Sequence, residues 1–122
     1  MTWVLIAVAG GVGSVLRRWV GILIEKAPRP RIPLATTVIN VTGSFLLGLL
    51  TALAADYAGL AEWKLVLGVG LLGGYTTFST ASVEVANLAL SPTPPGGILS
   101  VLHGASMLVL AAAAGALGLW LG

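Results

Sequence analysis

A short run of small and hydroxylated residues in the middle of an apolar segment is the clearest chemical signal in the sequence. The run covers residues 73–82 and reads GGYTTFSTAS. Two adjacent glycines lower the helix preference by about 1 kcal/mol each, and the hydroxyls offer other partners to backbone groups that a helix would pair. Irregular backbone inside a membrane is tolerated where it lines a watery cavity or is buried in protein. The run predicts a broken helix that forms an ion or substrate site, the alternative being a continuous helix with a small-residue packing face.

The composition indicates that a lipid bilayer surrounds most of the chain. Of 122 residues, 57% are hydrophobic and only 8% are charged, whereas soluble domains carry about a quarter charged residues. The sequence has no cysteine and one histidine, which excludes disulfides, thiol nucleophiles and a histidine-based zinc site within one chain. The candidate nucleophiles lack a nearby base and no phosphate-binding motif is present, so we expect no enzyme activity. Burial in lipid also argues against nucleic acid as a partner.

Four polar side chains outside the run stand in apolar surroundings. Glu84 follows Phe78 by six residues, and its carboxylate either faces a polar cavity or partner or extends to the membrane interface. Asn40 could donate a hydrogen bond to an anion or join neighbouring helices. Arg17 follows only about 22 Å of uncharged helix, which places it within or at the mouth of the membrane. His103 is predicted to be packed or interfacial, not a ligand.

Four hydrophobic segments must position these residues. They cover about residues 2–24, 33–55, 63–90 and 98–121, and each is long enough to cross a membrane as a helix. None shows the alternation of a barrel strand, and proline-rich stretches separate the first segment from the second and the third from the fourth. The fold class is therefore an all-α membrane protein, with residues 1–122 as a single domain of four transmembrane helices, the third broken.

Basic residues are concentrated around the first loop. Five flank or occupy it and only Lys64 lies on the other side of the membrane: Arg17, Arg18, Lys26, Arg29 and Arg31. By the positive-inside rule, the first and third loops face the cytoplasm and both termini face outside. The chain is thus expected to be a multi-pass protein of the cell membrane with one favoured orientation.

Three motifs resemble the CrcB/Fluc family of fluoride channels. Residues 73–80, GGYTTFST, with Ser82 and Glu84 after them, are similar to the third-helix signature of that family. Residues 10–17, GGVGSVLR, are similar to its first-helix motif, and Pro33 through Asn40 to residues 43–48, GSFLLG, to its second-helix motif. The resemblance covers nearly the whole chain. It implies passive export of fluoride, which lowers fluoride toxicity, by an antiparallel dimer with two pores and a structural sodium ion at the interface.

The resemblance also implies roles for individual residues. Gly73 and Thr76 would offer backbone carbonyls to sodium, a hard cation that suits oxygen ligands. Phe78 would present its positive ring edge to fluoride, and Asn40 would donate a hydrogen bond.

Hydroxyls and charged groups complete the implied fluoride pathway. Thr77, Ser79 and Thr80 could replace lost hydration, and Arg17 would raise the anion concentration in the vestibule. Glu84 is placed on the pore, although a carboxylate repels fluoride unless it is protonated or turned away.

The sequence departs from the family pattern at two places. Ala81 stands where the family usually has a second phenylalanine, and residues 107–115, MLVLAAAAG, replace the usual tyrosine and serine track of the fourth helix. Together with the strong charge bias, these departures favour pairing with an oppositely oriented paralogue as much as an antiparallel dimer of the chain with itself.

Two other classes of membrane protein have a similar size. A small four-helix multidrug or cation transporter requires a glutamate within the first helix, and this sequence has none before Glu25. A structural membrane subunit would need no break in the third helix.

Overall fold

The structure is a computed structural model that describes residues 1–26 and 33–122, and Arg29 and Arg31 lie outside this range. Its described residues form helices and turns without strands. The elements in chain order are α1 (Thr2–Glu25), α2 (Ala35–Asp56), the 3-10 turn η1 (Ala58–Leu60), α3 (Ala61–Trp63), the π-helix η2 (Lys64–Leu72), α4 (Gly73–Tyr75), α5 (Ser79–Ala89) and α6 (Gly96–Leu121). Four helical runs are long and apolar enough to cross a membrane, the third extending over Ala58–Ala89.

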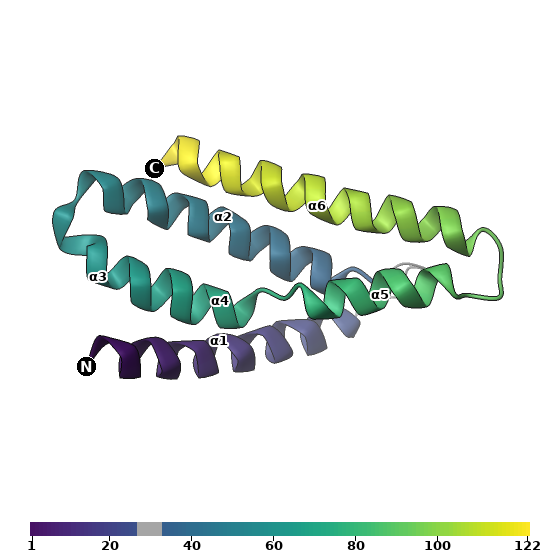
Figure 1. Ribbon diagram of the computed structural model, residues 1–122, viewed down its shortest axis with the longest axis horizontal. Helices are drawn as coiled ribbons and strands as arrows, with labels where there is room; N and C mark the ends of the chain where they lie inside the picture. Colours follow the sequence, from purple (N-terminus) through teal and green to yellow (C-terminus); the bar gives the residue numbers. More distant parts are fainter. Residues whose placement is uncertain (27–32) are drawn as a thin grey trace.

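The four runs lie roughly along the long axis of the molecule (Figure 1). α2 packs along α6, α1 packs against η2 and α4, and α5 crosses to pack against the first half of α6. Both termini lie at the same end, and the interruption between α4 and α5 falls near the middle (Figure 1). This arrangement brings the polar run of the third segment between α1 and α2.

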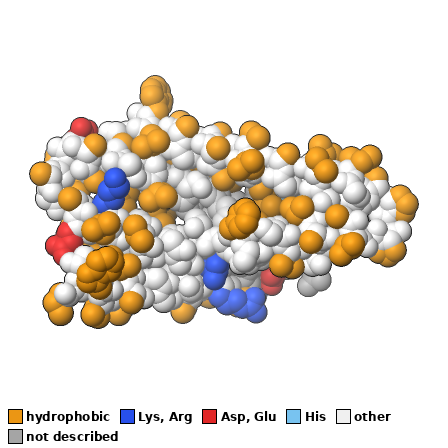
Figure 2. All heavy atoms as spheres, in the orientation of Figure 1, with side chains coloured by type: hydrophobic (Ala, Val, Ile, Leu, Met, Phe, Trp, Pro, Cys, Tyr) orange, Lys and Arg blue, Asp and Glu red, His pale blue; other side chains and the backbone are white. Residues whose placement is uncertain are grey.

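Apolar side chains cover the outside of the molecule. Figure 2 shows hydrophobic side chains spread along one whole face, with acidic and basic groups confined to a few small clusters. Among the described residues, the large hydrophobic side chains that are buried are Ile39, Val66, Leu72 and Met107. An apolar exterior with few buried side chains suits a bilayer, where lipid replaces water as solvent.

Glycines let the helices approach closely. A Cβ atom on Gly48 of α2 would overlap the Gly115 carbonyl oxygen of α6, and one on Gly118 would overlap the Phe45 carbonyl oxygen. Gly48 and Gly118 therefore allow α2 and α6 to pack with their backbones in close contact. On the other side of the molecule, a Cβ on Gly74 of α4 would overlap the carbonyl oxygen of Gly10 in α1.

The predicted break of the third helix is confirmed, and the continuous-helix alternative is wrong. Helix α4 ends at Tyr75, Thr76 has an extended backbone with φ −76° and ψ 159°, and α5 begins at Ser79. The π-helical winding of η2 was not predicted; it lies where Gly68 and Gly70 reduce side-chain bulk, and such segments often occur at functional sites.

Helix boundaries differ from the predicted ones by a few residues. The third run starts at Ala58 instead of 63, because a 3-10 turn and α3 continue through the polar residues of the second loop. α6 starts at Gly96 instead of 98, directly after Pro95, whose carbonyl oxygen accepts from the Leu99 N–H. α2 starts two residues later than predicted, at Ala35, and ends at Asp56.

Candidate functional site

The break between α4 and α5 frees backbone carbonyls in the middle of the membrane segment. In a continuous helix, the carbonyls of Gly73 and Thr76 would accept from the N–H groups of Thr77 and Thr80. Here the Thr77 N–H donates to Asn40 Oδ1 (2.9 Å) and the Thr80 N–H donates to Thr77 Oγ1 (3.2 Å). The break therefore presents carbonyl oxygens that have lost their helical donors, the chemistry that a cation site or a polar cavity uses.

Asn40 of α2 holds the break in place. Its Nδ2 donates to the Thr77 carbonyl oxygen at 2.9 Å, while its Oδ1 accepts from the Thr77 N–H. These two bonds fix the orientation of the amide group and join α2 to the break. The second proton on Nδ2 is still available as a donor, so the interhelical role and the anion-donor role are compatible.

α1 supplies two donors to the freed carbonyls. Arg17 Nη1 donates to the Thr76 carbonyl oxygen at 3.3 Å, and Ser14 Oγ approaches the Gly74 carbonyl oxygen at 3.4 Å. Arg17 thus lies beside the break, where its positive charge acts on the middle of the site. Gly73 accepts no bond from a side chain in the described part of the chain, which leaves its carbonyl oxygen available.

The hydroxyls of the run have different surroundings. Thr77 is buried and caps the start of α5, with its Oγ1 also within 3.3 Å of Ser79 Oγ and bonded to Thr80 Oγ1 at 3.2 Å. Ser79 and Thr80 are exposed and lie outside the lining of the cavity described next. The structure therefore places Thr77 at the site and the other two hydroxyls on its outer side.

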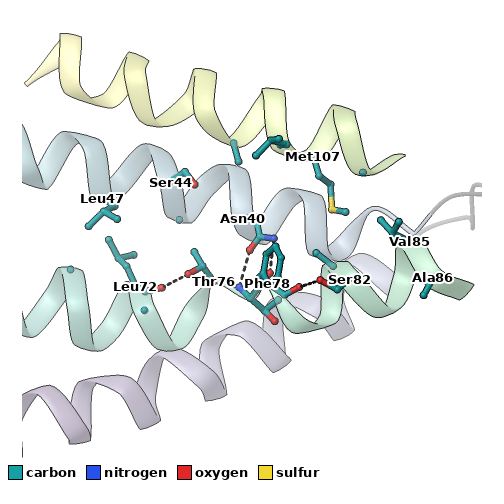
Figure 3. A pocket seen from close by; sticks show the side chains of 18 of the residues that line it. Asn40, Ser44, Leu47, Leu72, Thr76, Phe78, Ser82, Val85, Ala86 and Met107 are labelled. Atoms are coloured by element: carbon teal, nitrogen blue, oxygen red, sulfur yellow. Dashed lines mark hydrogen bonds between the residues drawn. The ribbon is translucent and has the colours of Figure 1, made fainter. Parts of the chain in front are cut away.

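A cavity of about 680 Å³ opens beside the break, lined by residues of α2, η2, α4, α5 and α6. Figure 3 shows Phe78 and Asn40 next to each other in this cavity, with Met107 on the α6 side. Phe78 is 88% exposed, although it is a large apolar residue at the centre of the molecule. The remaining lining is mostly apolar and includes Ala81. The arrangement is a groove with a ring at its centre and few polar groups, open on the side that lipid or a partner would cover.

Comparison with known proteins identifies the family of the chain. The family model described as CrcB-like protein, Camphor Resistance (CrcB), matches residues 4–122. The chain belongs to the CrcB family. It is 50% identical to Fluoride-specific ion channel FluC 1 of Leifsonia xyli over 96% of this chain and 83% of that protein. It is 43% identical to FluC 2 of Cutibacterium acnes over 100% of this chain and 98% of that protein, and 34% identical to FluC 2 of Yersinia pseudotuberculosis over 95% and 92%.

Glu84 of this CrcB chain is turned toward neighbouring helices. Its Oε1 accepts from Thr36 Oγ1 of α2 at 2.5 Å, and its Oε2 lies 3.3 Å from His103 Nε2 of α6. Thr36 and His103 are each only 4% exposed. Glu84 therefore directs its carboxylate toward α2 and α6 and does not line the cavity, and His103 is packed, as predicted.

Sequence reasoning missed two residues near the site, Thr36 and Ser44. Ser44 lines the cavity together with Ser82 of the predicted run, and Thr36 bonds Glu84. The signal that could have found Thr36 and Ser44 is their spacing of four residues on either side of Asn40, which puts all three on one face of α2. The partner that Glu84 finds on α6 could not be read from spacing, because it depends on how two separate helices pack.

Proposed function

We propose that the chain is a channel that passively exports fluoride across the cell membrane and so lowers its toxicity in the cytoplasm. Support comes from membership of the CrcB family and from relatives named fluoride-specific ion channels. The single observation that carries the proposal is the groove at the helix break, with Phe78 and Asn40 at its centre. A ring edge and neutral donors bind a small hydrated anion weakly enough for release, which conduction requires.

Arg17 and Thr77 serve this pathway in different ways. Arg17 adds positive potential beside the break, which attracts anions. Thr77 shapes the pathway by capping α5 and holding the break open toward the cavity. Ser79 and Thr80 are exposed outside the groove lining, and in the proposed dimer their hydroxyls would replace water around the ion.

A structural sodium ion is part of the proposal, held by the backbone carbonyls of Gly73 and Thr76. The residues fit such an ion, because both carbonyl oxygens have lost their helical donors at the break. Carbonyl oxygens are the ligands that hard cations prefer. The Thr76 oxygen has a second lone pair beside its bond from Arg17, so it can serve both.

The working unit in this proposal is an antiparallel dimer of the chain with an oppositely oriented paralogue. One subunit leaves Phe78 and the groove uncovered. Ala81 and Met107 add neither an aromatic ring nor a hydroxyl to the groove, so the partner subunit would supply a second ring and further hydroxyls to the pathway. Basic residues are concentrated around the first loop, so the positive-inside rule favours cytoplasmic first and third loops and termini on the outside. This preference argues against insertion of the same chain in both membrane orientations.

Fluoride resistance of cells tests the proposed function. A bacterium without its own fluoride exporter is grown in millimolar fluoride while expressing this chain together with its paralogue. We expect growth to be restored by the pair and lost when Phe78→Ala is present in this chain. Val83→Ala is the matched control, because Val83 is exposed on α5, five residues after Phe78, and lies outside the cavity lining. Failure of the wild-type pair to restore growth would contradict the proposal.

A further inference from the structure

One carbonyl oxygen of the helix break is bonded to a cationic side chain and is also proposed to bind a cation. The Thr76 carbonyl oxygen accepts from Arg17 Nη1 at 3.3 Å, and it is one of the two oxygens of this chain proposed to hold sodium. Its helical donor, the Thr80 N–H, is bonded to Thr77 Oγ1 instead. The two lone pairs of the oxygen can serve both partners, but two positive charges then share one ligand atom.

Close packing of α1 fixes the point from which the Arg17 side chain extends. Arg17 follows Gly13 by four residues, on the same face of α1. A Cβ on Gly13 would overlap the Leu71 carbonyl oxygen of η2, so the two backbones touch one turn before Arg17. Figure 1 shows α1 continuing from there beside α4. The helix packing therefore keeps the guanidinium within reach of the Thr76 oxygen.

A charge in this position opposes the binding of a second cation to the same oxygen. Like charges that share a ligand atom are close enough to repel at any effective dielectric constant found in proteins. The contact between Arg17 and Thr76 is partly buried, so water and salt screen the repulsion less than they would at an open surface. Arg17 thus weakens the affinity of the break for a cation while it attracts anions to the pathway.

We infer that Arg17 sets the sodium affinity of the channel by occupying one side of the Thr76 carbonyl oxygen. The inference rests on the proposed function, which assigns sodium to this oxygen. Removal of the Arg17 charge tightens sodium binding on the order of tenfold. The same removal lowers fluoride flux, because the positive potential beside the break is lost. A purely structural role predicts a different pattern, since a damaged break would weaken sodium binding and flux together.

Sodium-dependent thermal unfolding tests the inference without relying on conduction. The channel in the form that conducts fluoride, alone or with its paralogue, is heated in detergent micelles at a series of sodium concentrations, with choline holding the ionic strength constant. A ligand that binds the folded state raises Tm as its concentration exceeds Kd. The sodium concentration at which Tm begins to rise therefore reports affinity even where a substitution changes Tm without sodium.

Two neutral variants and one charged variant separate the charge of Arg17 from its shape. Arg17→Gln keeps a polar head and Arg17→Met keeps an apolar stem, so either one that folds provides the test. We expect both to show the rise in Tm at about one tenth of the wild-type sodium concentration, and Arg17→Lys, which keeps the charge, to stay within about twofold of the wild type. Fluoride efflux from liposomes should be several-fold lower in both neutral variants.

Arg18→Gln is the matched control for loss of one positive charge. Arg18 is exposed and adjoins Arg17, but neighbouring side chains on a helix point in directions about 100° apart. Its removal should leave the sodium dependence within about twofold of the wild type, because an exposed charge is well screened.

The possible outcomes separate the inference from the proposed function. Unchanged or weaker sodium binding in the neutral Arg17 variants, or an equal tightening in Arg18→Gln, would overturn the inference while leaving the channel in place. A wild-type Tm that responds equally to sodium and choline would reject the sodium site and the inference with it. Absence of fluoride efflux from the wild type would reject the proposed channel itself.

Discussion

Asn40 illustrates how one side chain serves both the fold and the site. Its two bonds to Thr77 give the interrupted backbone partners that the helix no longer provides, and one amide proton remains for the groove. Unpaired backbone groups at this depth are costly, because lipid offers no hydrogen bonds. The Asn40 amide therefore offsets the free-energy cost of interrupting the membrane helix at this position.

Replacing Asn40 by leucine should destabilise the protein as well as stop fluoride flux. Loss of two hydrogen bonds in a membrane protein predicts a decrease in unfolding free energy of about 1–3 kcal/mol. Denaturation in mixed micelles measures it, with Thr51→Val, a polar-to-apolar change further along α2, as the control. Equal stability of Asn40→Leu and Thr51→Val would show that the amide does not support the break.

Ala81→Phe should improve fluoride efflux by this chain reconstituted alone. Ala81 follows Phe78 by three residues and lines the same groove, so the substitution adds a second ring edge where a dimer of the chain with itself lacks one. We expect an increase of about tenfold, equivalent to about 1.4 kcal/mol in the barrier, in fluoride-electrode measurements. Val83→Phe adds the same ring outside the groove lining and should have no effect; equal rates for both variants would contradict the assignment.

At the scale of elements, close contact between α1 and α4 keeps Arg17 beside the break. Gly74 faces the Gly10 carbonyl oxygen without room for a Cβ, whereas Gly11 has nothing within 4 Å. Gly74→Ala should therefore lower the unfolding free energy by about 1–3 kcal/mol, through displacement of α1. Gly11→Ala should be neutral or stabilising by up to about 1 kcal/mol, because alanine favours helix. Denaturant titration of both variants gives the comparison, and a neutral Gly74→Ala would show that the contact is loose.

The elements were predictable where the cause is local. The break at Thr76 to Phe78 follows from adjacent glycines and clustered hydroxyls, and the apolar spans follow from their length and composition. The π-helical winding of η2 and the pairing of Glu84 with His103 were not predictable. Both depend on which surfaces separate helices present to each other, and sequence periodicity carries no information about that.

The whole molecule is expected to insert in one orientation. Because the chain has no cysteine, a single one introduced at Gly59 or at Thr93 reports the side of the membrane without background. We expect a membrane-impermeant maleimide to label Gly59→Cys in intact cells and Thr93→Cys only after lysis, since Gly59 lies in the second loop and Thr93 in the third. Equal labelling of both positions would indicate dual insertion and favour a dimer of the chain with itself.

Fluoride efflux from liposomes tests the central claim most directly. The purified chain is reconstituted alone and with its oppositely oriented paralogue, and loss of fluoride and of chloride is followed with ion-selective electrodes. The proposal predicts rapid, fluoride-selective efflux from the pair, abolished by Phe78→Ala in this chain, and little efflux from the chain alone. Rapid efflux from the chain alone would show that the partner subunit is a second copy of this chain and not a paralogue. No fluoride-selective efflux in either preparation would contradict the channel itself.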